Sequence, residues 1–356
     1  MPVIDADCHV IETERTWEYM EESERHLRPQ LFIPKNEEER GVAYWHVDGR
    51  YLHQHQDNLF GVPDTVGASG RGQVSQTSRE SRELTNLGQR LSHMDELGVD
   101  IQMLYPSFFV HIMTNKDDID LATCRSYNRW LAEIWKQSEN RLRWAVVPPL
   151  LTMDKALEEL HFGKENGACG VYMRTTERDR LLTDPYFYPI YEEASKLDMP
   201  ITVHDGEGNL AMRDLFSRGS GLFKFKMTMA ACFHDLLDQR LPDKFPDLRW
   251  GFMESSASWV PWVINDLDNR LAKTGGHVSP DIMKENRLYV ECLTRDDLPY
   301  VLKFSGEDNL VLGSDYGHAD TSAEIDAIRK LQQDSVIPSH VVDKILSDNP
   351  QALYGI

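Results

Sequence analysis

Acidic and histidine side chains lie at the ends of several short apolar runs of the chain. Asp7 and His9 belong to the first of these runs, and His204 and Asp315 each end a later one. Two histidines and two carboxylates provide the nitrogen and oxygen ligands that Zn²⁺, Mn²⁺ or Fe²⁺ accept. Such a set predicts a site for one divalent cation, provided that the fold brings the three runs together.

The spacing of the first pair favours this interpretation. Asp7 and His9 are two residues apart, so on an extended strand both side chains face the same way. Glu254 and Glu291 end two further runs. Several carboxylates without a partner would repel one another and be costly to remove from water. A divalent cation removes both problems.

The apolar runs recur along the whole chain, and most are followed by a helical pattern. Helix-like segments include residues 87–97, 121–139 and 186–197. Alternating apolar strands and helices indicate a parallel sheet that is covered on both faces. Eight such units fit a closed (β/α)₈ TIM barrel, whose active site lies at the carboxyl ends of the strands. The eight runs are residues 3–9, 99–105, 142–147, 170–173, 201–204, 249–254, 288–292 and 310–315.

Residues 12–86 interrupt this rhythm with a long insertion after strand 1. It contains aromatic residues, among them Tyr44, Trp45, Tyr51 and Phe60. Long loops without regular structure are uncommon unless they serve as lids or binding loops. We therefore predict one domain, residues 1–356, with 12–86 as a cap or lid over the site; a loop without a role is the alternative. The aromatic residues suit a planar substrate, although aromatics also fill cores.

Charge and composition exclude several classes of partner. The chain has 38 Lys and Arg against 58 Asp and Glu, a net charge of −20, which disfavours binding to nucleic acid or to a membrane surface. No run approaches the roughly 18–20 apolar residues of a membrane span, and the first residues lack the features of a signal peptide. We expect a cytoplasmic protein that acts on a small molecule. Five scattered cysteines predict neither a disulfide framework nor a thiolate zinc site.

Five blocks of the sequence match, in order, a known pattern: residues 3–12, 182–191 with 199–204, 245–249 with 254–261, 313–320 and 349–354. They resemble the amidohydrolase-related (amidohydrolase 2) family typified by aminocarboxymuconate-semialdehyde decarboxylase and the γ-resorcylate and 5-carboxyvanillate decarboxylases. The resemblance implies a (β/α)₈ barrel with one divalent metal, without distinguishing zinc, manganese and iron. It implies a homo-oligomer, expected to be a dimer, and by position it implies the ligands Asp7, His9, His204 and Asp315.

Three positions distinguish branches of that family. Many relatives have histidine where this chain has Asp7, whereas the aromatic decarboxylases have a carboxylate, so Asp7 favours a decarboxylase. Several relatives have a catalytic histidine at the end of strand six, where this chain has Glu254. Binuclear relatives have lysine at the end of strand four, where this chain has Met173 and Arg174. A second metal bridged by a carbamylated lysine is therefore not expected.

Three residues are candidates for catalysis. Asp315 suits proton transfer as well as ligation, because a carboxylate beside a cation can exchange protons with water or substrate; ligation alone is the alternative. His318 would steer a proton or bind a substrate oxyanion, or else only hydrogen bond within its loop. Glu254 would act as an acid or base, or anchor a ligand histidine, and the anchoring role is slightly favoured.

Two residues are candidates for substrate binding. Arg174 can pair with a substrate carboxylate in bidentate fashion, and a salt bridge to a nearby acid is equally compatible with its position. His234 falls in the predicted helix at residues 222–241. A packed or surface histidine is the more common role for a residue in such a helix.

Two reactions fit a metal site of this kind. A lyase would decarboxylate a small aromatic or unsaturated acid, with Asp315 protonating the carbon that loses CO₂. A hydrolase would cleave an amide, lactone or related bond with metal-bound hydroxide, with His318 or Glu254 assisting the leaving group. The lyase is slightly favoured by Asp7. A binding barrel without activity is a third hypothesis, and it would predict the loss of ligands that are all present.

Overall fold

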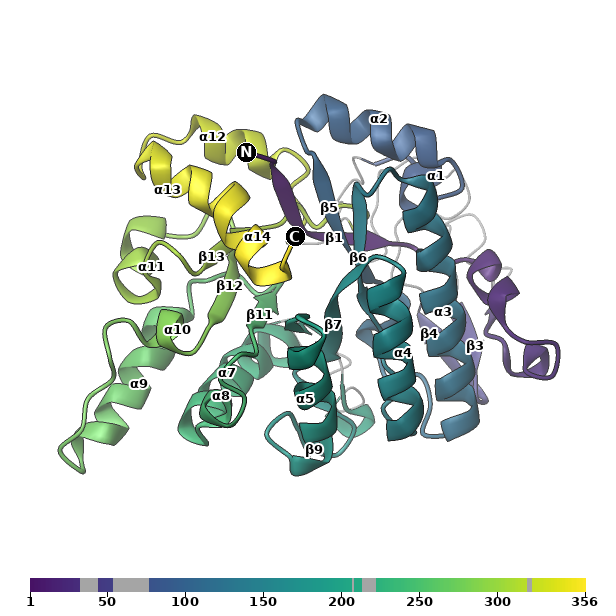
Figure 1. Cartoon of the computed structure of the whole chain (residues 1–356), viewed down its shortest axis with the longest axis horizontal. Coiled ribbons are helices and arrows are strands. Elements are labelled where there is room, and N and C mark those ends of the chain that lie inside the picture. Colours follow the sequence, from purple (N-terminus) through teal and green to yellow (C-terminus); the bar gives the residue numbers. More distant parts are fainter. Residues whose placement is uncertain (33–43, 54–76, 207, 213–221, 319–321) are drawn as a thin grey trace.

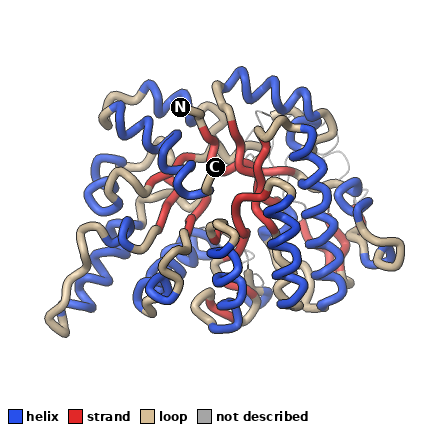
Figure 2. Tube along the Cα trace, viewed as in Figure 1, coloured by secondary structure: helices blue, strands red, loops and turns tan. Residues whose placement is uncertain are grey.

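Eight parallel strands form the centre of the molecule (Figures 1 and 2). The computed structural model describes residues 1–32, 44–53, 77–206, 208–212, 222–318 and 322–356. Each strand pairs with the next in the order β1-β5-β6-β7-β10-β11-β12-β13. The strands are β1 Ile4–Val10, β5 Ile101–Pro106, β6 Leu142–Val146, β7 Ala168–Arg174, β10 Ile201–His204, β11 Trp250–Met253, β12 Leu288–Cys292 and β13 Leu310–Leu312.

The sheet closes on itself between β1 and the segment that follows β13. Asp315 donates its backbone N–H to Asp7 O at 3.0 Å, and His9 donates its own to Tyr316 O at 2.6 Å. A parallel bridge joins Cys8 and Tyr316. The predicted barrel is thereby confirmed, and every predicted strand lies within a few residues of an observed one.

Helices surround the barrel (Figure 2). The longer ones are α2 Leu87–Leu97, α3 Asp117–Gln137, α4 Met153–Glu165, α5 Tyr188–Lys196, α7 Thr228–Asp238, α9 Val260–Ala272 and α11 Leu298–Ser305. Shorter ones are α1 Arg79–Arg82, α8 Leu241–Lys244, α10 Ile282–Glu285, α12 Ala327–Gln333, α13 Ser339–Asp343 and α14 Asn349–Tyr354. Local signals set some of the bounds. At the start of α2, Asn86 accepts the N–H of Gln89, and the helix ends at Gly98 in the left-handed region.

The strands are apolar because both of their faces are buried. Helices cover the outer face, and side chains fill the inside of the barrel. All seven residues of β1 and of β7 are buried, and so are all those of β10, β11 and β13. The five cysteine thiols are free and buried. No helix in the described part of the chain has the length and apolar character needed to cross a membrane.

The insertion contains regular structure that the sequence did not reveal. After the short 3₁₀ segments Glu14–Tyr19 and Arg25–Leu27, an antiparallel sheet combines β2 Gln30–Phe32, β3 Tyr44–Val47 and β4 Arg50–His53. Trp45 of β3 packs on Trp17, with ring centroids 5.9 Å apart, and Trp17 packs on Phe108 at 4.7 Å.

Both tryptophans are buried, so these aromatics fill a core rather than face a substrate. Tyr51 is exposed, and Phe60 lies outside the described residues. The role of residues 12–86 as a lid stays a prediction.

Two further short elements complete the rim. Strands β8 Thr176–Glu177 and β9 Arg180–Leu181 form a small hairpin after β7. The helix predicted at residues 222–241 begins with a π-helical turn, Leu222–Met227, and becomes α-helical at α7.

Candidate metal centre

The carboxyl ends of four strands bring charged side chains together inside the barrel. Asp7 and His9 are fully buried on β1, and His204 is fully buried at the end of β10. Glu254 directly follows β11, and Asp315 follows β13 after two small residues. The parallel arrangement places all of these strand ends at one mouth of the barrel.

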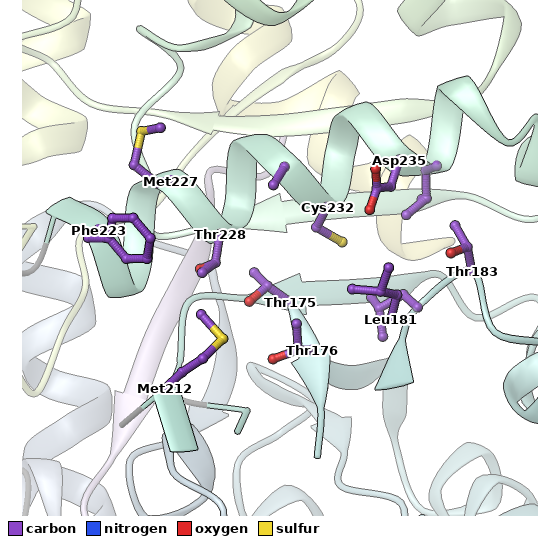
Figure 3. A pocket seen from close by; sticks show the side chains of 13 residues that line it. Thr175, Thr176, Leu181, Thr183, Met212, Phe223, Met227, Thr228, Cys232 and Asp235 are labelled. Atoms are coloured by element: carbon purple, nitrogen blue, oxygen red, sulfur yellow. The ribbon is translucent and has the colours of Figure 1, made fainter. Parts of the chain in front are cut away.

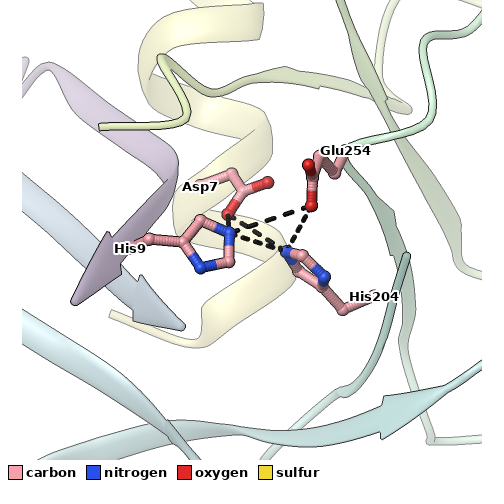
Figure 4. Close-up of side chains that lie close together, drawn as sticks. All are labelled: Asp7, His9, His204 and Glu254. Carbon is pink, nitrogen blue, oxygen red and sulfur yellow. Dashed lines mark hydrogen bonds and ion pairs between the residues drawn. The ribbon is translucent and has the colours of Figure 1, made fainter. Parts of the chain in front are cut away.

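Four of the side chains point their donor atoms at one another (Figure 4). His9 Nε2 and His204 Nε2 are 3.1 Å apart. Asp7 Oδ1 is 3.7 Å from His9 Nε2 and 3.5 Å from His204 Nε2. Glu254 Oε2 is 3.8 Å and 3.4 Å from the same two nitrogens. Each residue thus offers one atom to a common centre in which all donors lie within 4.8 Å of one another.

The two imidazole rings are oriented through their other nitrogens. His9 Nδ1 donates to the carbonyl of Pro106 at 3.1 Å, and His204 Nδ1 donates to that of Asp205 at 2.8 Å. A carbonyl only accepts, so both Nδ1 atoms carry the proton and, in the neutral rings, both Nε2 atoms carry lone pairs. Two facing lone pairs cannot bond to each other. A divalent cation between them is the partner that such oriented histidines accept.

Asp315 and His318 extend the centre on the other side of His9. Asp315 Oδ1 is 3.6 Å from His9 Nε2 and 2.9 Å from His318 Nδ1. The rings of His318 and His9 stack with centroids 3.7 Å apart. His9, Asp315 and His318 form a second group of donors close enough to share an ion. Of the four ligands implied by the resemblance, Asp7, His9 and His204 therefore lie in one group of donors together with Glu254, and Asp315 lies in a second group that shares His9.

The far nitrogen of His318 has a defined role as a donor. Ser107 donates its hydroxyl to Val10 O at 2.8 Å. Its oxygen therefore accepts from His318 Nε2, which lies 2.7 Å away. With Nε2 protonated, His318 Nδ1 faces the carboxyl of Asp315, so the two groups compete for or share one proton. Such a pair can exchange a proton with a group that lies within hydrogen-bond reach of it.

Glu291 supports Asp7 and Glu254 from beneath. Its Oε2 accepts the backbone N–H of Glu254 at 2.5 Å. Burial, and then the charge of Asp7, raise the pKa of Glu291 well above its usual range. These two effects favour the protonated form of Glu291, in which its hydroxyl donates a hydrogen bond to Asp7.

A glycine makes this close packing possible. A Cβ atom on Gly313 would lie 2.4 Å from Asp7 Cβ and 2.7 Å from Glu291 Oε1. Real Cβ atoms do not approach so closely, so a side chain at this position would displace Asp7 or Glu291.

The backbone at two of the strand ends is strained. Glu254 and Asp315 have φ angles of 64° and 52°, in the left-handed region that non-glycine residues rarely adopt. Such conformations persist where the surrounding structure holds them, and they cluster at functional sites. Here they turn both carboxylates out of the strand direction and towards the histidines.

Arg174, a candidate for substrate binding, is buried at the end of β7 and already engaged. Its Nη2 pairs with Glu177 Oε2 at 2.5 Å, and its Nη1 donates to Phe109 O at 2.5 Å. The salt bridge named as an alternative is therefore present. Contact of Arg174 with substrate stays a prediction.

His234, the second such candidate, does not join the centre. Its Nε2 is 3.3 Å from Asp266 Oδ2 of α9. The buried face of α7 includes Phe233 and Leu236, and His234 lies beside that face, towards α9. This placement agrees with the alternative of a packed or surface histidine.

A buried hydrogen-bond network next to the candidate metal centre was not predicted from the sequence. Asp5 accepts the backbone N–H and the hydroxyl of Ser314 at 2.8 Å and 2.6 Å, and so anchors the residue before Asp315. The register of β1 shifts between Asp5 and Cys8, so the alternation of side chains along a regular strand does not predict this position of Asp5. Gln102 joins the network by donating to Asp5 at 3.3 Å.

Arg90 of α2 completes this network, and no sequence pattern marks it. It is fully buried, donates to Gln102 Oε1 at 2.7 Å and to His9 O at 3.3 Å, and stacks 3.5 Å above the ring of Tyr316. One buried cation thus ties the end of β1 to the loop that carries Asp315.

Comparisons with known proteins identify the family of the chain. The family model described as amidohydrolase matches residues 4–356. A 2-amino-3-carboxymuconate-6-semialdehyde decarboxylase from Dictyostelium discoideum is 23% identical over 239 residues, which cover 64% of this chain and 65% of that protein. The match therefore spans less than two thirds of that relative's length.

Solved structures show the same fold. An amidohydrolase from Mycobacterium avium subsp. paratuberculosis superposes with a TM-score of 0.80 at 17% identity, covering 100% of this chain and 98% of that one. A 5-carboxyvanillate decarboxylase from Novosphingobium aromaticivorans, determined with bound manganese, has a TM-score of 0.66 at 17% identity, with coverages of 79% and 86%. Since the family model spans nearly the whole chain, the protein belongs to the amidohydrolase family.

Proposed function

We propose that the protein is a metal-dependent lyase that decarboxylates a small aromatic or unsaturated carboxylic acid. One observation carries the proposal: two histidine Nε2 atoms with oriented rings face each other at 3.1 Å. Asp7 Oδ1 lies within 3.7 Å of both nitrogens, and Asp315 Oδ1 lies 3.6 Å from that of His9. The decarboxylases among the similar proteins support this reaction over other reactions of the family.

The donor set fits one divalent cation. Asp7, His9, His204 and Asp315 would hold it, and Glu254 lies close enough to contribute an oxygen. When bound, the cation would supply Lewis acidity towards the substrate carboxylate and a neighbouring oxygen. The mixed nitrogen and oxygen donors suit zinc, manganese or iron.

Asp315 and His318 would handle the proton. Decarboxylation breaks the bond between the carboxyl group and its carbon, whose electron pair then takes up a proton as CO₂ leaves. Asp315 would deliver that proton, because its carboxyl group lies between His9 and His318. His318 would return a proton to Asp315 from Nδ1 after its ring has taken one up from water, since Ser107 holds the ring with Nδ1 towards Asp315.

Arg174 would help to orient the substrate. Two of its guanidinium nitrogens are held by Glu177 and Phe109. Its Nε has no hydrogen-bond partner among the described residues. That N–H would be available to an oxygen of the acid.

A screen of purified, metal-loaded protein tests the proposal. Aromatic and unsaturated carboxylates are assayed for CO₂ release, and amides and lactones are assayed for hydrolysis, each with and without exhaustive chelation. We expect CO₂ release that is lost on chelation and restored by the metal. Chelator-sensitive hydrolysis without CO₂ release would establish the hydrolase instead. Light scattering of the same sample tests the expected homodimer.

A further inference from the structure

A pocket of about 370 Å³ lies between helix α7 and the segment that follows β7 (Figure 3). Thr175, Thr176 and Leu181 line one side, and Phe223, Met227 and Cys232 line the other. Among the described residues that line it, none belongs to the metal centre. Its volume lies within the range of about 300–1,000 Å³ that is usual for small-molecule sites. We call it the α7 pocket.

Most of the lining is apolar, and part of it is exposed. Leu181 is 48% exposed, Phe223 47% and Met227 38%. These partly exposed apolar side chains surround the pocket. A ligand that fills the pocket removes their surface from water, which is favourable. The lining therefore favours an apolar occupant.

One buried hydroxyl in the pocket lacks a partner. Thr175 is 2% exposed, and its Oγ1 has no hydrogen-bond partner among the residues that the structure describes. Thr228, across the pocket, donates its hydroxyl to Phe225 O at 2.8 Å. Figure 3 shows the Thr175 side chain directed into the space beneath α7. Because a buried hydroxyl without a partner is costly, a ligand that accepts its hydrogen bond would satisfy it.

The charge of the lining residues further restricts the kind of ligand that the pocket accepts. Asp235 is the one ionisable carboxyl group among the described lining residues. The Cys232 thiol stays neutral, because burial raises its pKa above the usual range. A carboxylate in the wall disfavours an anionic occupant. The preferred ligand therefore differs from the acid that the metal centre would take.

We propose that the α7 pocket binds a neutral, mainly apolar small molecule that accepts a hydrogen bond from the Thr175 hydroxyl. This site is additional to the metal centre and does not depend on the reaction proposed for it. Thr175 directly follows Arg174, which pairs in register with His204. A ligand bound to Thr175 would therefore lie one residue along the chain from Arg174, at the end of β7 beside His204.

Three ligands of matched size and shape test the proposal. Acetophenone is neutral and has a carbonyl acceptor, isopropylbenzene has a methyl group in place of that oxygen, and benzoate is an anion. Each is titrated into the metal-loaded full-length protein and followed by ligand-observed NMR. We expect saturable binding of acetophenone that is about 3- to 10-fold tighter than that of isopropylbenzene, the usual effect of one neutral hydrogen bond.

Two variants locate the binding. Thr175→Val keeps the shape and removes the hydroxyl, so acetophenone should bind it no more tightly than isopropylbenzene. Ala231 is exposed on α7 and lines the pocket, so Ala231→Trp should fill the space and abolish the binding of both. Thr274→Val and Ala272→Trp, at exposed positions outside the pocket, are the matched controls and should bind like the unmodified protein.

Either of two results overturns the proposal. One is that acetophenone shows no saturable binding, or binding that Ala231→Trp leaves unchanged. The other is that benzoate binds as tightly as acetophenone in a manner sensitive to Ala231→Trp, which would contradict the preference for a neutral ligand. Benzoate binding that Ala231→Trp does not affect belongs to the metal centre, and the proposal stands.

Discussion

The Nε2 atoms of His9 and His204 face each other at 3.1 Å, although the two residues are 195 positions apart in the chain. Each ring is turned by a backbone carbonyl that holds its Nδ1 proton. The two lone pairs are therefore brought together by the barrel itself, with carboxylates on both sides. This arrangement favours the binding of a cation between the two nitrogen atoms.

Replacing His204 tests its role in holding the metal. His204→Ala removes one of the two facing donors, so the metal content of the purified protein should fall about tenfold or more. Elemental analysis measures it, and circular dichroism checks the fold. His161→Ala, at an exposed ion pair with Glu193, should keep the full metal content. Undiminished metal in His204→Ala would show that this nitrogen is not a ligand.

Replacing Asp315 separates proton transfer from metal binding. Asp315→Asn keeps an oxygen near His9 but cannot deliver a proton. The rate of CO₂ release at saturating substrate should fall about 100-fold or more, while the metal content falls much less. The exposed Asp247→Asn serves as the control. Equal losses of metal and activity would restrict Asp315 to ligation.

Glu12 should make stability depend on pH. Burial raises its pKa to about 8, and its Oε2 accepts the N–H of Phe108 at 2.9 Å. Below about pH 4.5 the carboxyl group is protonated in both states. As the pH rises towards 8, only the unfolded chain loses the proton, so the free energy of unfolding decreases and then levels off.

The variant Glu12→Gln cannot ionise and should lack this decrease. Its stability relative to the unmodified protein should rise between pH 5 and 8 by up to about 1.4 kcal/mol per pH unit. Urea denaturation at several pH values measures the difference, with the exposed Glu14→Gln as the control. A difference that stays constant with pH would mean that Glu12 ionises normally in the folded protein.

Gly313 is expected to tolerate no side chain. Gly313→Ala would place a Cβ 2.4 Å from Asp7 Cβ, so we expect a loss of about 1–3 kcal/mol in the free energy of unfolding together with weaker metal binding. At Gly88 in α2, the nearest atom to an added Cβ is 3.6 Å away. Gly88→Ala should therefore be neutral or stabilise the protein by about 0.5 kcal/mol. Equal effects of the two substitutions would contradict the conclusion that close packing against Asp7 and Glu291 requires glycine at position 313.

Arg90 should stabilise the folded protein through its contacts with Gln102, His9 and Tyr316. Arg90→Met keeps most of the length of the side chain but leaves Gln102, His9 O and the ring of Tyr316 without the guanidinium. We expect a loss of about 3–5 kcal/mol in stability. Arg90→Lys restores the charge but not the planar fork, so only part of the stability should return. Full recovery with lysine would show that charge alone matters.

The strands could be predicted because burial on both faces forces apolar runs. The candidate ligands could be picked out because they lie at or near the ends of those runs, and their role in binding metal stays a prediction. The sheet β2–β4 was missed because its strands are short and partly exposed. Arg90, Gln102 and Ser107 were missed for a different reason. Their roles depend on contacts between residues far apart in the chain, which no local pattern records. Glu254 was expected either to act as an acid or base or to anchor a ligand histidine. Its Oε2 lies 3.4 Å from His204 Nε2, whereas the ring is held through Nδ1 by the carbonyl of Asp205, so the anchoring role belongs to that carbonyl.

The most direct test of the metal centre is an anomalous diffraction map of crystals grown with manganese or zinc. We expect one strong peak bounded by His9 Nε2, His204 Nε2 and the carboxylates of Asp7 and Asp315, each at a coordinating distance of about 2.0–2.3 Å. A protein that is loaded with metal in solution but shows its peak elsewhere, or shows none among these four residues, would contradict the site and the reaction proposed for it.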